Sequence, residues 1–313
     1  MAKAQAKSTS YRNRIILLIA AGLFIYVVLP QIGAFQNSFT IARQADPILI
    51  GIALLCSALT YVAAANTYFI LALKKLKYLR TILAQLASMF VNRLLPAGIG
   101  SIGANYVYLR KSKHSLSQAA SVVSANNIAG IIGHVLLTSL LLIIFSDQIP
   151  EINAFKPIQN GSLTVLALLV FGIILYIAAR YNTKYRSKII EVGNQLAAYR
   201  HHPLQLIGAL LSSISLTLFS IACLYFCMLS LDVDLSFIVV MLIFTLGVAA
   251  GTATPTPGGL GGVEAGLIAG FIAAGVATPT AFAIALTYRF IHYWISLVTG
   301  AGAFIICRKR GYM

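Results

Sequence analysis

The chain has 313 residues, of which 59% are hydrophobic and only 10% are charged, with a mean hydropathy of +0.88. A soluble domain carries about 25% charged residues, so this composition excludes a soluble globular protein. The net charge of +16 would suggest nucleic acid in a soluble protein, but an excess of Lys and Arg in cytoplasmic loops explains it here, and we expect no nucleic-acid partner.

The apolar segments predict an all-α polytopic membrane protein with six transmembrane helices. Stretches that are long enough to cross a bilayer cover residues 14–37, 48–73, 115–146, 161–180, 204–230 and 279–306. Two further apolar segments, 81–109 and 235–277, are broken near the centre by Pro and clustered Gly, which stop a helix. We therefore expect two broken helical segments between the spans.

The charged linkers predict the orientation of these segments. Placing the N-terminus and all the basic linkers inside puts 19 of the 23 Lys and Arg residues in the cytoplasm, together with both termini. Residues 81–109 have basic linkers on both sides, so this segment should enter and leave the membrane from the cytoplasm as a re-entrant hairpin. Residues 235–277 follow an acidic linker, so the second hairpin should return to the outer face.

The two breakers are near copies of each other. Residues 96–104 align without gaps onto residues 257–265, with four of the nine positions identical. Each half of the single transmembrane domain (1–313) reads span, span, hairpin, span, and three crossings per half make residues 1–148 and 149–313 an inverted repeat. Paired Gly/Pro interruptions in two halves point to the binding site of a transporter.

The breakers supply the first group of candidate binding residues. The exposed N–H groups and the dipole at the start of a half-helix attract an anion, which would suit a phosphate headgroup or a small anion. The alternative is that the glycines only permit close helix packing. The candidates are Pro96, Gly98 and Gly100 in the first breaker, and Pro257, Gly258, Gly259 and Gly261 in the second.

Three charged residues lie inside the apolar segments, where each charge costs about 2.5–3.5 kcal/mol. Arg93 precedes the first breaker, Glu264 follows the second, and Arg289 lies well inside the last span. Either arginine could clamp a phosphate. Glu264 could pair with Arg289 or Arg93 as a fixed salt bridge, or carry a proton in a coupled cycle, and the sequence leaves these alternatives open.

Other polar residues in the apolar segments are weaker candidates. Asn105 follows the first breaker, Asn126 and Asn127 form an amide pair in the third span, and Tyr288 precedes Arg289. Hydrogen bonding between helices is the plain alternative for the amides. The four cysteines have no metal-site spacing, so we expect no metal and no other cofactor.

The residues 92–100 (NRLLPAGIG) and 255–265 (PTPGGLGGVEA), followed by Tyr288 and Arg289, resemble the lysylphosphatidylglycerol synthase transmembrane region family. This resemblance covers nearly the whole chain and implies a flippase-like membrane domain. In two-part members it implies movement of aminoacylated phosphatidylglycerol between leaflets, while a separate acetyltransferase-like domain transfers lysine from tRNA. The chain ends at Met313, so we expect no synthase domain and no enzymatic activity.

We therefore predict a flippase that moves a phospholipid or an aminoacyl lipid between leaflets of the cytoplasmic membrane. The alternatives are a secondary transporter of a small anionic solute and a membrane scaffold without transport activity. The expected partners are membrane lipids with anionic headgroups; a homo-oligomer and a separate lipid-modifying enzyme are further candidates.

Overall fold

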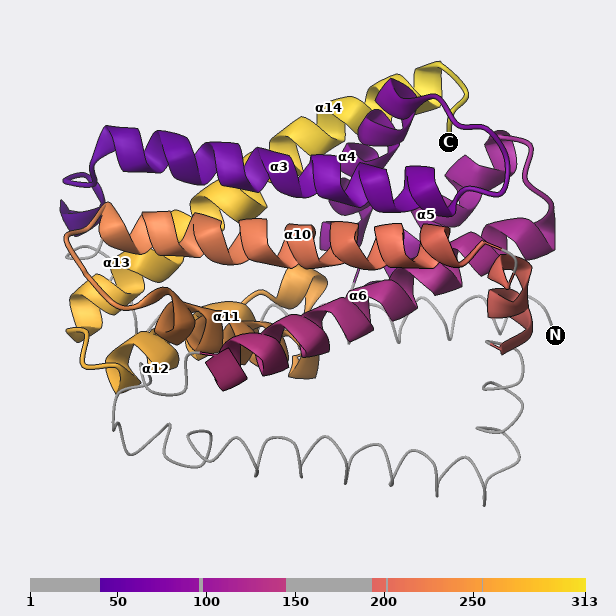
Figure 1. Cartoon of the computed structure of the whole chain (residues 1–313). Helices are drawn as coiled ribbons and strands as arrows, with labels where there is room; N and C mark the ends of the chain where they lie inside the picture. The colour runs from indigo at the N-terminus through magenta and orange to yellow at the C-terminus, as the bar shows by residue number, and fades with distance from the viewer. Residues whose placement is uncertain (1–39, 96–97, 145–192, 201, 255) are drawn as a thin grey trace, which may run out of the picture.

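The computed structural model describes residues 40–95, 98–144, 193–200, 202–254 and 256–313 (Figure 1). Within these ranges all regular secondary structure is helical. Four helices are long and apolar enough to cross a membrane: Pro47–Leu71, Leu116–Leu141, Pro203–Leu229 and Thr278–Lys309. They confirm the predicted spans at 48–73, 115–146, 204–230 and 279–306, whereas the predicted spans at 14–37 and 161–180 lie outside the described residues.

The described helices follow one another in two similar series. The first series is α3 (Pro47–Leu71), α4 (Tyr78–Leu94), α5 (Ile99–Lys111) and α6 (Leu116–Ile144). After the short helix η4 (Ala197–Tyr199), the second series is α10 (Pro203–Leu229), α11 (Phe237–Ala253), η5 (Pro257–Gly259), α12 (Gly262–Ala273), α13 (Thr278–Arg289), η6 (Phe290–Ile295) and α14 (Ser296–Lys309).

Helices α3 and α10 lie antiparallel, side by side, and extend across the molecule (Figure 1). At one end, the backbone N–H of Asp46 donates to the carbonyl of Ser230 at 2.9 Å. At the other end, the Tyr199 hydroxyl donates to the carbonyl of Leu71 at 2.7 Å. Asp46 also caps α3 by accepting from the N–H of Ile48 at 2.7 Å, so the α3 start is fixed both locally and against α10.

Helices α4 and α5 form the first hairpin, which we define as residues 78–111. Side chains join the two helices along their length: Thr81 contacts the Tyr108 hydroxyl at 2.9 Å, and the Gln85 amide donates to Asn105 Oδ1 at 2.7 Å. Nearer the turn, Asn105 donates to Ser88 Oγ at 2.7 Å. These buried hydrogen bonds fix an antiparallel register, so both ends of the first hairpin lie at the same end of the molecule.

Helices α11 and α12, joined through η5, form the second hairpin, residues 237–273. They approach closely where two glycines meet, because a Cβ on Gly266 would lie 2.8 Å from the Cα of Gly247. Large side chains fill the space between this hairpin and the long helices, including Ile221, Leu224, Met241, Phe271 and Ile284, all of which are fully buried.

The last span consists of α13, η6 and α14 in one continuous path. Residues 290–295 form a π-helix, a wider turn that is frequent at functional sites. Beyond it, α14 packs against α4, where Phe90 and Phe304 place their ring centroids 5.7 Å apart. The last span therefore contacts the first hairpin through α14, while α13 contacts the second hairpin through α12.

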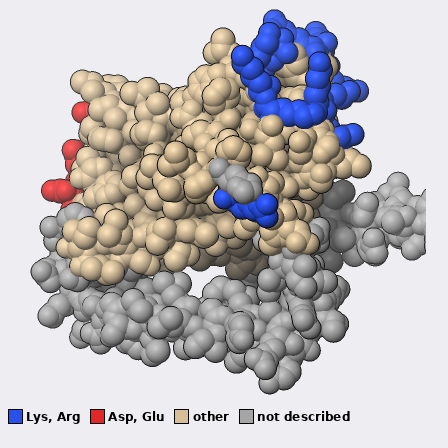
Figure 2. Space-filling model, turned by 45° about the vertical axis from the view of Figure 1, so that its right-hand side comes forward, with Lys and Arg blue, Asp and Glu red and all other residues tan. Residues whose placement is uncertain are grey.

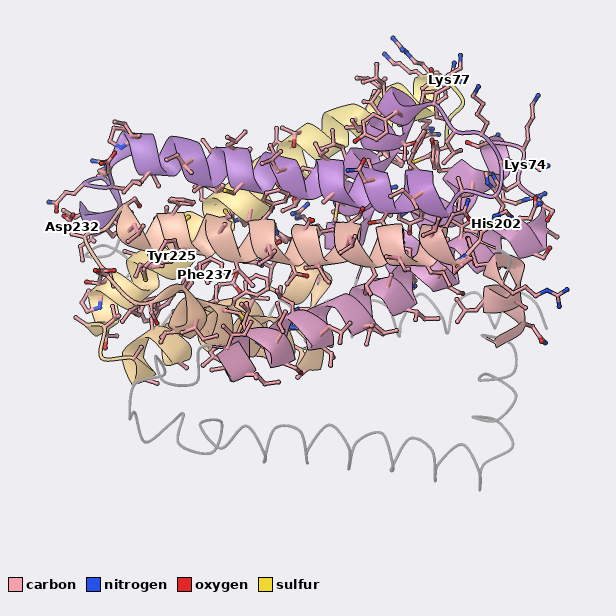
Figure 3. The ribbon with its side chains drawn as sticks, in the orientation of Figure 1. Lys74, Lys77, His202, Tyr225, Asp232 and Phe237 are labelled. Atoms are coloured by element: carbon pink, nitrogen blue, oxygen red, sulfur yellow. The ribbon has the colours of Figure 1, made fainter. Side chains whose placement is uncertain are left out.

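On the face shown in Figure 2, the visible Lys and Arg residues gather at one end of the described structure and the visible acidic residues at the other. Lys74 and Lys77 lie at one end and Asp232 at the other (Figure 3). Contacts draw the basic segments together at their end: Lys74 Nζ donates to the carbonyl of Lys113 at 2.6 Å, and the Arg80 guanidinium lies 4.7 Å from the centroid of the Tyr312 ring. The first hairpin thus starts and ends at the basic end.

Candidate functional site

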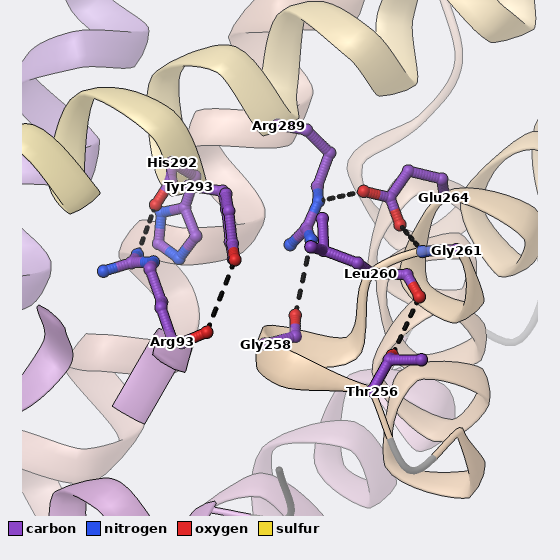
Figure 4. A network of polar contacts seen from close by, with 9 residues as sticks. All are labelled: Arg93, Thr256, Gly258, Leu260, Gly261, Glu264, Arg289, His292 and Tyr293. Atoms are coloured by element: carbon purple, nitrogen blue, oxygen red, sulfur yellow. Dashed lines mark hydrogen bonds and ion pairs between the residues drawn. The ribbon is translucent and has the colours of Figure 1, made fainter. Parts of the chain in front are cut away.

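The turns of the two hairpins meet beside the π segment of the last span. Helix η5 of the second hairpin contacts α4 of the first, and both approach the residues that follow Arg289. Figure 4 shows this meeting point from close by. We call its residues the tip site: Arg93, Gly258, Gly261, Glu264, Arg289, His292 and Tyr293.

Glu264 and Arg289 form a salt bridge between the second hairpin and the last span. Arg289 Nε donates to Glu264 Oε1 at 2.6 Å, and the two side chains are 7% and 20% exposed, respectively. The other carboxylate oxygen, Oε2, accepts from the N–H of Gly261 at 2.8 Å. Glu264 therefore neutralises the arginine and caps the start of α12 with the same carboxylate.

Arg289 has a further partner in the second hairpin. Its Nη2 donates to the carbonyl of Gly258 at 3.3 Å, and Thr256 closes the same turn by donating to the carbonyl of Leu260 at 2.8 Å. The guanidinium is thus held by a carboxylate on one side and a backbone carbonyl on the other. This arrangement fixes the second hairpin to the last span.

Arg93 is bound much less completely. It is 9% exposed and ends α4, and its Nη2 donates to the carbonyl of His292 at 2.5 Å. Its Nη1 is buried and has no hydrogen-bond partner among the residues that the structure describes. Because a buried N–H group without a hydrogen-bond partner is costly, this nitrogen is suited to binding an anionic or polar ligand.

The Tyr293 ring lies between the two arginines (Figure 4). The guanidinium carbons of Arg93 and Arg289 are 5.4 Å and 4.4 Å from its centroid, within cation–π range. The Tyr293 hydroxyl also reaches the carbonyl of Arg93 at 3.5 Å. One aromatic ring therefore lies between two positive charges, of which only Arg289 has a carboxylate partner among the described residues.

Glycines let the backbone turn tightly at both hairpins. Gly98 has φ +74° immediately before α5, and Gly258 has φ +60° within η5. A Cβ at Gly258 would collide with Cε2 of Tyr293, so a side chain there would displace the ring. The glycine at position 258 is therefore required both by its backbone conformation and by the close approach of Tyr293.

The structure brings together part of the predicted set of site residues. Arg93, Gly258, Gly261, Glu264 and Arg289 all belong to the tip site. Pro257 and Gly259 complete the η5 turn, and Gly98 and Gly100 shape the start of α5. Of its two possible salt-bridge partners, Glu264 pairs with Arg289.

The remaining candidates lie elsewhere. Asn105 bonds within the stem of the first hairpin, and Asn126 and Asn127 lie on α6, half-buried and exposed, and take no part in the described tip-site contacts. Tyr288 is buried and stacks on His292 with a centroid distance of 5.2 Å, so it adjoins the tip site without contacting either arginine through a described hydrogen bond. Pro96 lies outside the described residues.

Two tip-site residues were absent from the predicted set, namely His292 and Tyr293. The sequence offered a reason to include them, because both lie about one helical turn after Arg289 in an apolar span. His292 faces α3 as well, with Nδ1 lying 3.3 Å from the Ser57 hydroxyl. The π-helix that positions these residues has no distinctive hydropathy pattern, so it could not be predicted from the sequence.

Comparison with known proteins places the chain in a family. It matches the family described as lysylphosphatidylglycerol synthase TM region over residues 14–300. It is also similar to a protein of Methanocaldococcus jannaschii named UPF0104 membrane protein MJ1078, with 29% identity over 230 residues that cover 71% of this chain and 96% of the relative. The chain therefore belongs to the lysylphosphatidylglycerol synthase TM region family of multi-pass membrane proteins, as the sequence predicted.

Proposed function

We propose that this protein is a flippase-like transporter that moves an anionic lipid between leaflets of the cytoplasmic membrane. The headgroup binds at the tip site, where Arg93 supplies the first contact to its phosphate. The observation that carries the proposal is the buried Nη1 of Arg93, which lacks a partner among the described residues. A guanidinium is well suited to a phosphate because its N–H groups match two phosphate oxygens.

The lengths of the hairpin helices support a site within the membrane. Helices α5 and α12 have 13 and 12 residues, fewer than the roughly 20 that a spanning helix needs. The 17 residues of α4 reach about 25 Å from the basic end to Arg93. Both hairpins are therefore proposed as re-entrant, in an inverted repeat with their turns meeting inside the bilayer.

The separation of charge supports the orientation of the repeat. Positively charged loops favour the cytoplasm, so we place the basic end and both termini there. The first hairpin then enters from the cytoplasm and the second from the outside, and the tip site can exchange a headgroup with either leaflet. Alternating access in transporters of this type uses a site at the interface of the repeats.

The surface beside Arg93 favours a lipid over a free solute. Leu94 and Leu95 directly follow Arg93 and are 53% and 43% exposed, and Ile99 at the start of α5 is 60% exposed. These side chains form an exposed apolar surface within a few residues of the buried guanidinium. A lipid could keep its acyl chains along this surface while its headgroup reaches the tip site.

The test is reconstitution of the purified protein into phosphatidylcholine vesicles that contain a trace of fluorescent phosphatidylglycerol. Membrane-impermeant dithionite bleaches only the outer leaflet, so exchange between leaflets shows as bleaching beyond one half. Wild-type protein should accelerate this exchange over protein-free vesicles. Uptake of radiolabelled inorganic phosphate, measured in the same vesicles, tests the solute alternative: phosphate uptake without lipid exchange would overturn the proposal.

A further inference from the structure

We infer that the cargo headgroup carries a phosphate but no ammonium group, as in an unmodified anionic phospholipid. This inference rests on the proposed function and narrows its substrate class. The inferred headgroup differs from that of the aminoacylated lipids after which the family is named. A lysyl ester adds two ammonium groups to the headgroup and makes it cationic. The tip site offers phosphate a contact and offers ammonium none.

The carboxylate that an ammonium group would need already has a partner on each of its oxygens. Glu264 is the only Asp or Glu within the predicted apolar segments of the whole sequence. Its Oε1 accepts from Arg289 at 2.6 Å and its Oε2 accepts from Gly261 at 2.8 Å. An ammonium group bound there would compete with Arg289 and Gly261 for this carboxylate and would bring a second positive charge next to Arg289.

The aromatic ring at the centre of the tip site is also occupied. An ammonium group can bind over the face of an aromatic ring, but the Tyr293 ring already lies between Arg93 and Arg289 (Figure 4). The neighbouring Tyr288 ring stacks on His292, with an angle of 11° between the planes. Each of these two tyrosine rings therefore already has a stacking or cation–π partner.

The charge balance of the tip site points to a monoanionic headgroup. Its two arginines and one glutamate leave one positive charge, which resides on Arg93, the arginine without a carboxylate partner among the described residues. A phosphodiester carries one negative charge and would complete this balance. A zwitterionic or cationic headgroup would bring positive charge next to two guanidinium groups, and like charges in contact are strongly disfavoured.

Headgroup selectivity tests the inference with the full-length protein. Three lipids with the same fluorescent acyl chain are compared in phosphatidylcholine vesicles: phosphatidylglycerol, phosphatidylethanolamine and lysyl-phosphatidylglycerol. We expect phosphatidylglycerol to exchange at least about tenfold faster than lysyl-phosphatidylglycerol, with phosphatidylethanolamine between them. Equal rates, or faster exchange of the lysyl lipid, would overturn the inference while leaving the flippase proposal intact. No exchange of any lipid would instead sink the flippase proposal.

A charge reversal at Arg93 gives a second, independent readout. With Arg93→Glu, lysyl-phosphatidylglycerol should exchange faster than phosphatidylglycerol, the reverse of the order in the wild-type protein. Arg310→Glu, at the exposed basic end, should leave the order of the exchange rates unchanged. Size-exclusion chromatography in detergent establishes that each variant is folded. If Arg93→Glu does not fold, Arg93→Gln should still bring the ratio of the phosphatidylglycerol and lysyl-lipid rates closer to one, and an unchanged ratio counts against the inference.

Discussion

The turns of the two hairpins use the same motif to opposite electrostatic effect. At the matched positions Gly98 and Gly259 the backbone has nearly the same conformation, with φ values of +74° and +67°. After the second turn, Glu264 forms an ion pair with Arg289. Before the first turn, Arg93 has one nitrogen, Nη1, with no hydrogen-bond partner among the described residues. The ion pair fixes the second hairpin to the last span, whereas we propose that Arg93 of the first hairpin binds an anion.

The difference extends to the way in which each half-helix begins. Helix α5 starts at Ile99, where Asn92 Oδ1 accepts from the N–H of Ser101 at 3.2 Å. Helix α12 starts at Gly262, two positions later in the aligned motif, and its cap is the charged Glu264. Position 103, which matches Glu264, is a glycine. The neutral cap and the charged cap thus come from different positions of the two hairpins.

The largest expected effect comes from removing the carboxylate of the second turn. Glu264→Ala leaves Arg289 buried without its counterion, which should lower stability by about 3 kcal/mol. Asp234→Ala, at the exposed acidic end, is the matched control and should change stability by less than about 0.5 kcal/mol. Thermal unfolding in detergent micelles measures both.

A double variant separates the ion pair from the cap of α12. Glu264→Ala combined with Arg289→Met removes both charges, so it should regain part of the loss in melting temperature. If the double variant is less stable than Glu264→Ala alone, the cost does not come from the unpaired guanidinium.

The next largest effect is expected when an alanine replaces the glycine in each of the two tight turns. Gly258→Ala adds a side chain where φ is +60° and where Cβ would strike the Tyr293 ring. Gly98→Ala meets only Asn92 Oδ1 at 4.0 Å, so it pays the backbone strain alone, about 1–2 kcal/mol. We expect Gly258→Ala to lower the melting temperature about twice as much, and equal losses would show that the ring does not constrain this turn.

The two arginines should also differ in what they contribute to stability. Arg289→Gln strands Glu264 and should destabilise the protein, whereas Arg93→Gln removes a charge with an unsatisfied nitrogen and should change stability by less than about 1 kcal/mol. The measurement is again thermal unfolding in detergent. Similar losses for both variants would mean that Arg93 has a structural partner comparable to Glu264.

The smallest expected effect lies at the foot of the first hairpin, in the loop between α5 and α6. His114 is buried there, its Nε2 accepts from the N–H of Lys74 at 3.1 Å, and burial and then the Lys74 charge lower its pKa below the usual 6.5. The unfolded chain therefore takes up the proton first as the pH falls. Stability should be complete above about pH 6.5 and decline below it, by at most about 1.4 kcal/mol per pH unit.

The variant His114→Gln provides the control for this pH dependence. Its melting temperature should fall less between pH 7.5 and 5.5 than that of the wild-type protein. An identical slope in the two proteins would assign the decline to other groups.

Much of the architecture follows from composition and charge alone. Long apolar runs and helix breakers located four spans and both hairpins to within a few residues, because hydropathy and the effect of Pro and Gly are local properties of the sequence. The motif likewise located the tip site, since Arg93 precedes the first breaker and Glu264 follows the second.

The pairing inside the tip site could not be predicted in the same way. Glu264 could have met either arginine, because 25 residues separate it from Arg289 and the choice depends on how the second hairpin packs against the last span. Tyr293 reaches both arginines through a π segment that has no periodic signature in the sequence. Asn105 was assigned to the site because it follows the breaker, but its hydrogen bonds to Gln85 and Ser88 hold it in the hairpin stem.

The central claim is that Arg93, and not the basic surface, contacts the anionic cargo. Its most direct test is the rate of phosphatidylglycerol exchange in vesicles for Arg93→Gln and for Arg310→Gln, the same substitution at the exposed basic end. The account predicts that Arg93→Gln reduces the rate at least about tenfold, equivalent to about 1.4 kcal/mol, while Arg310→Gln stays close to wild type. Equal rates for the two variants would contradict it.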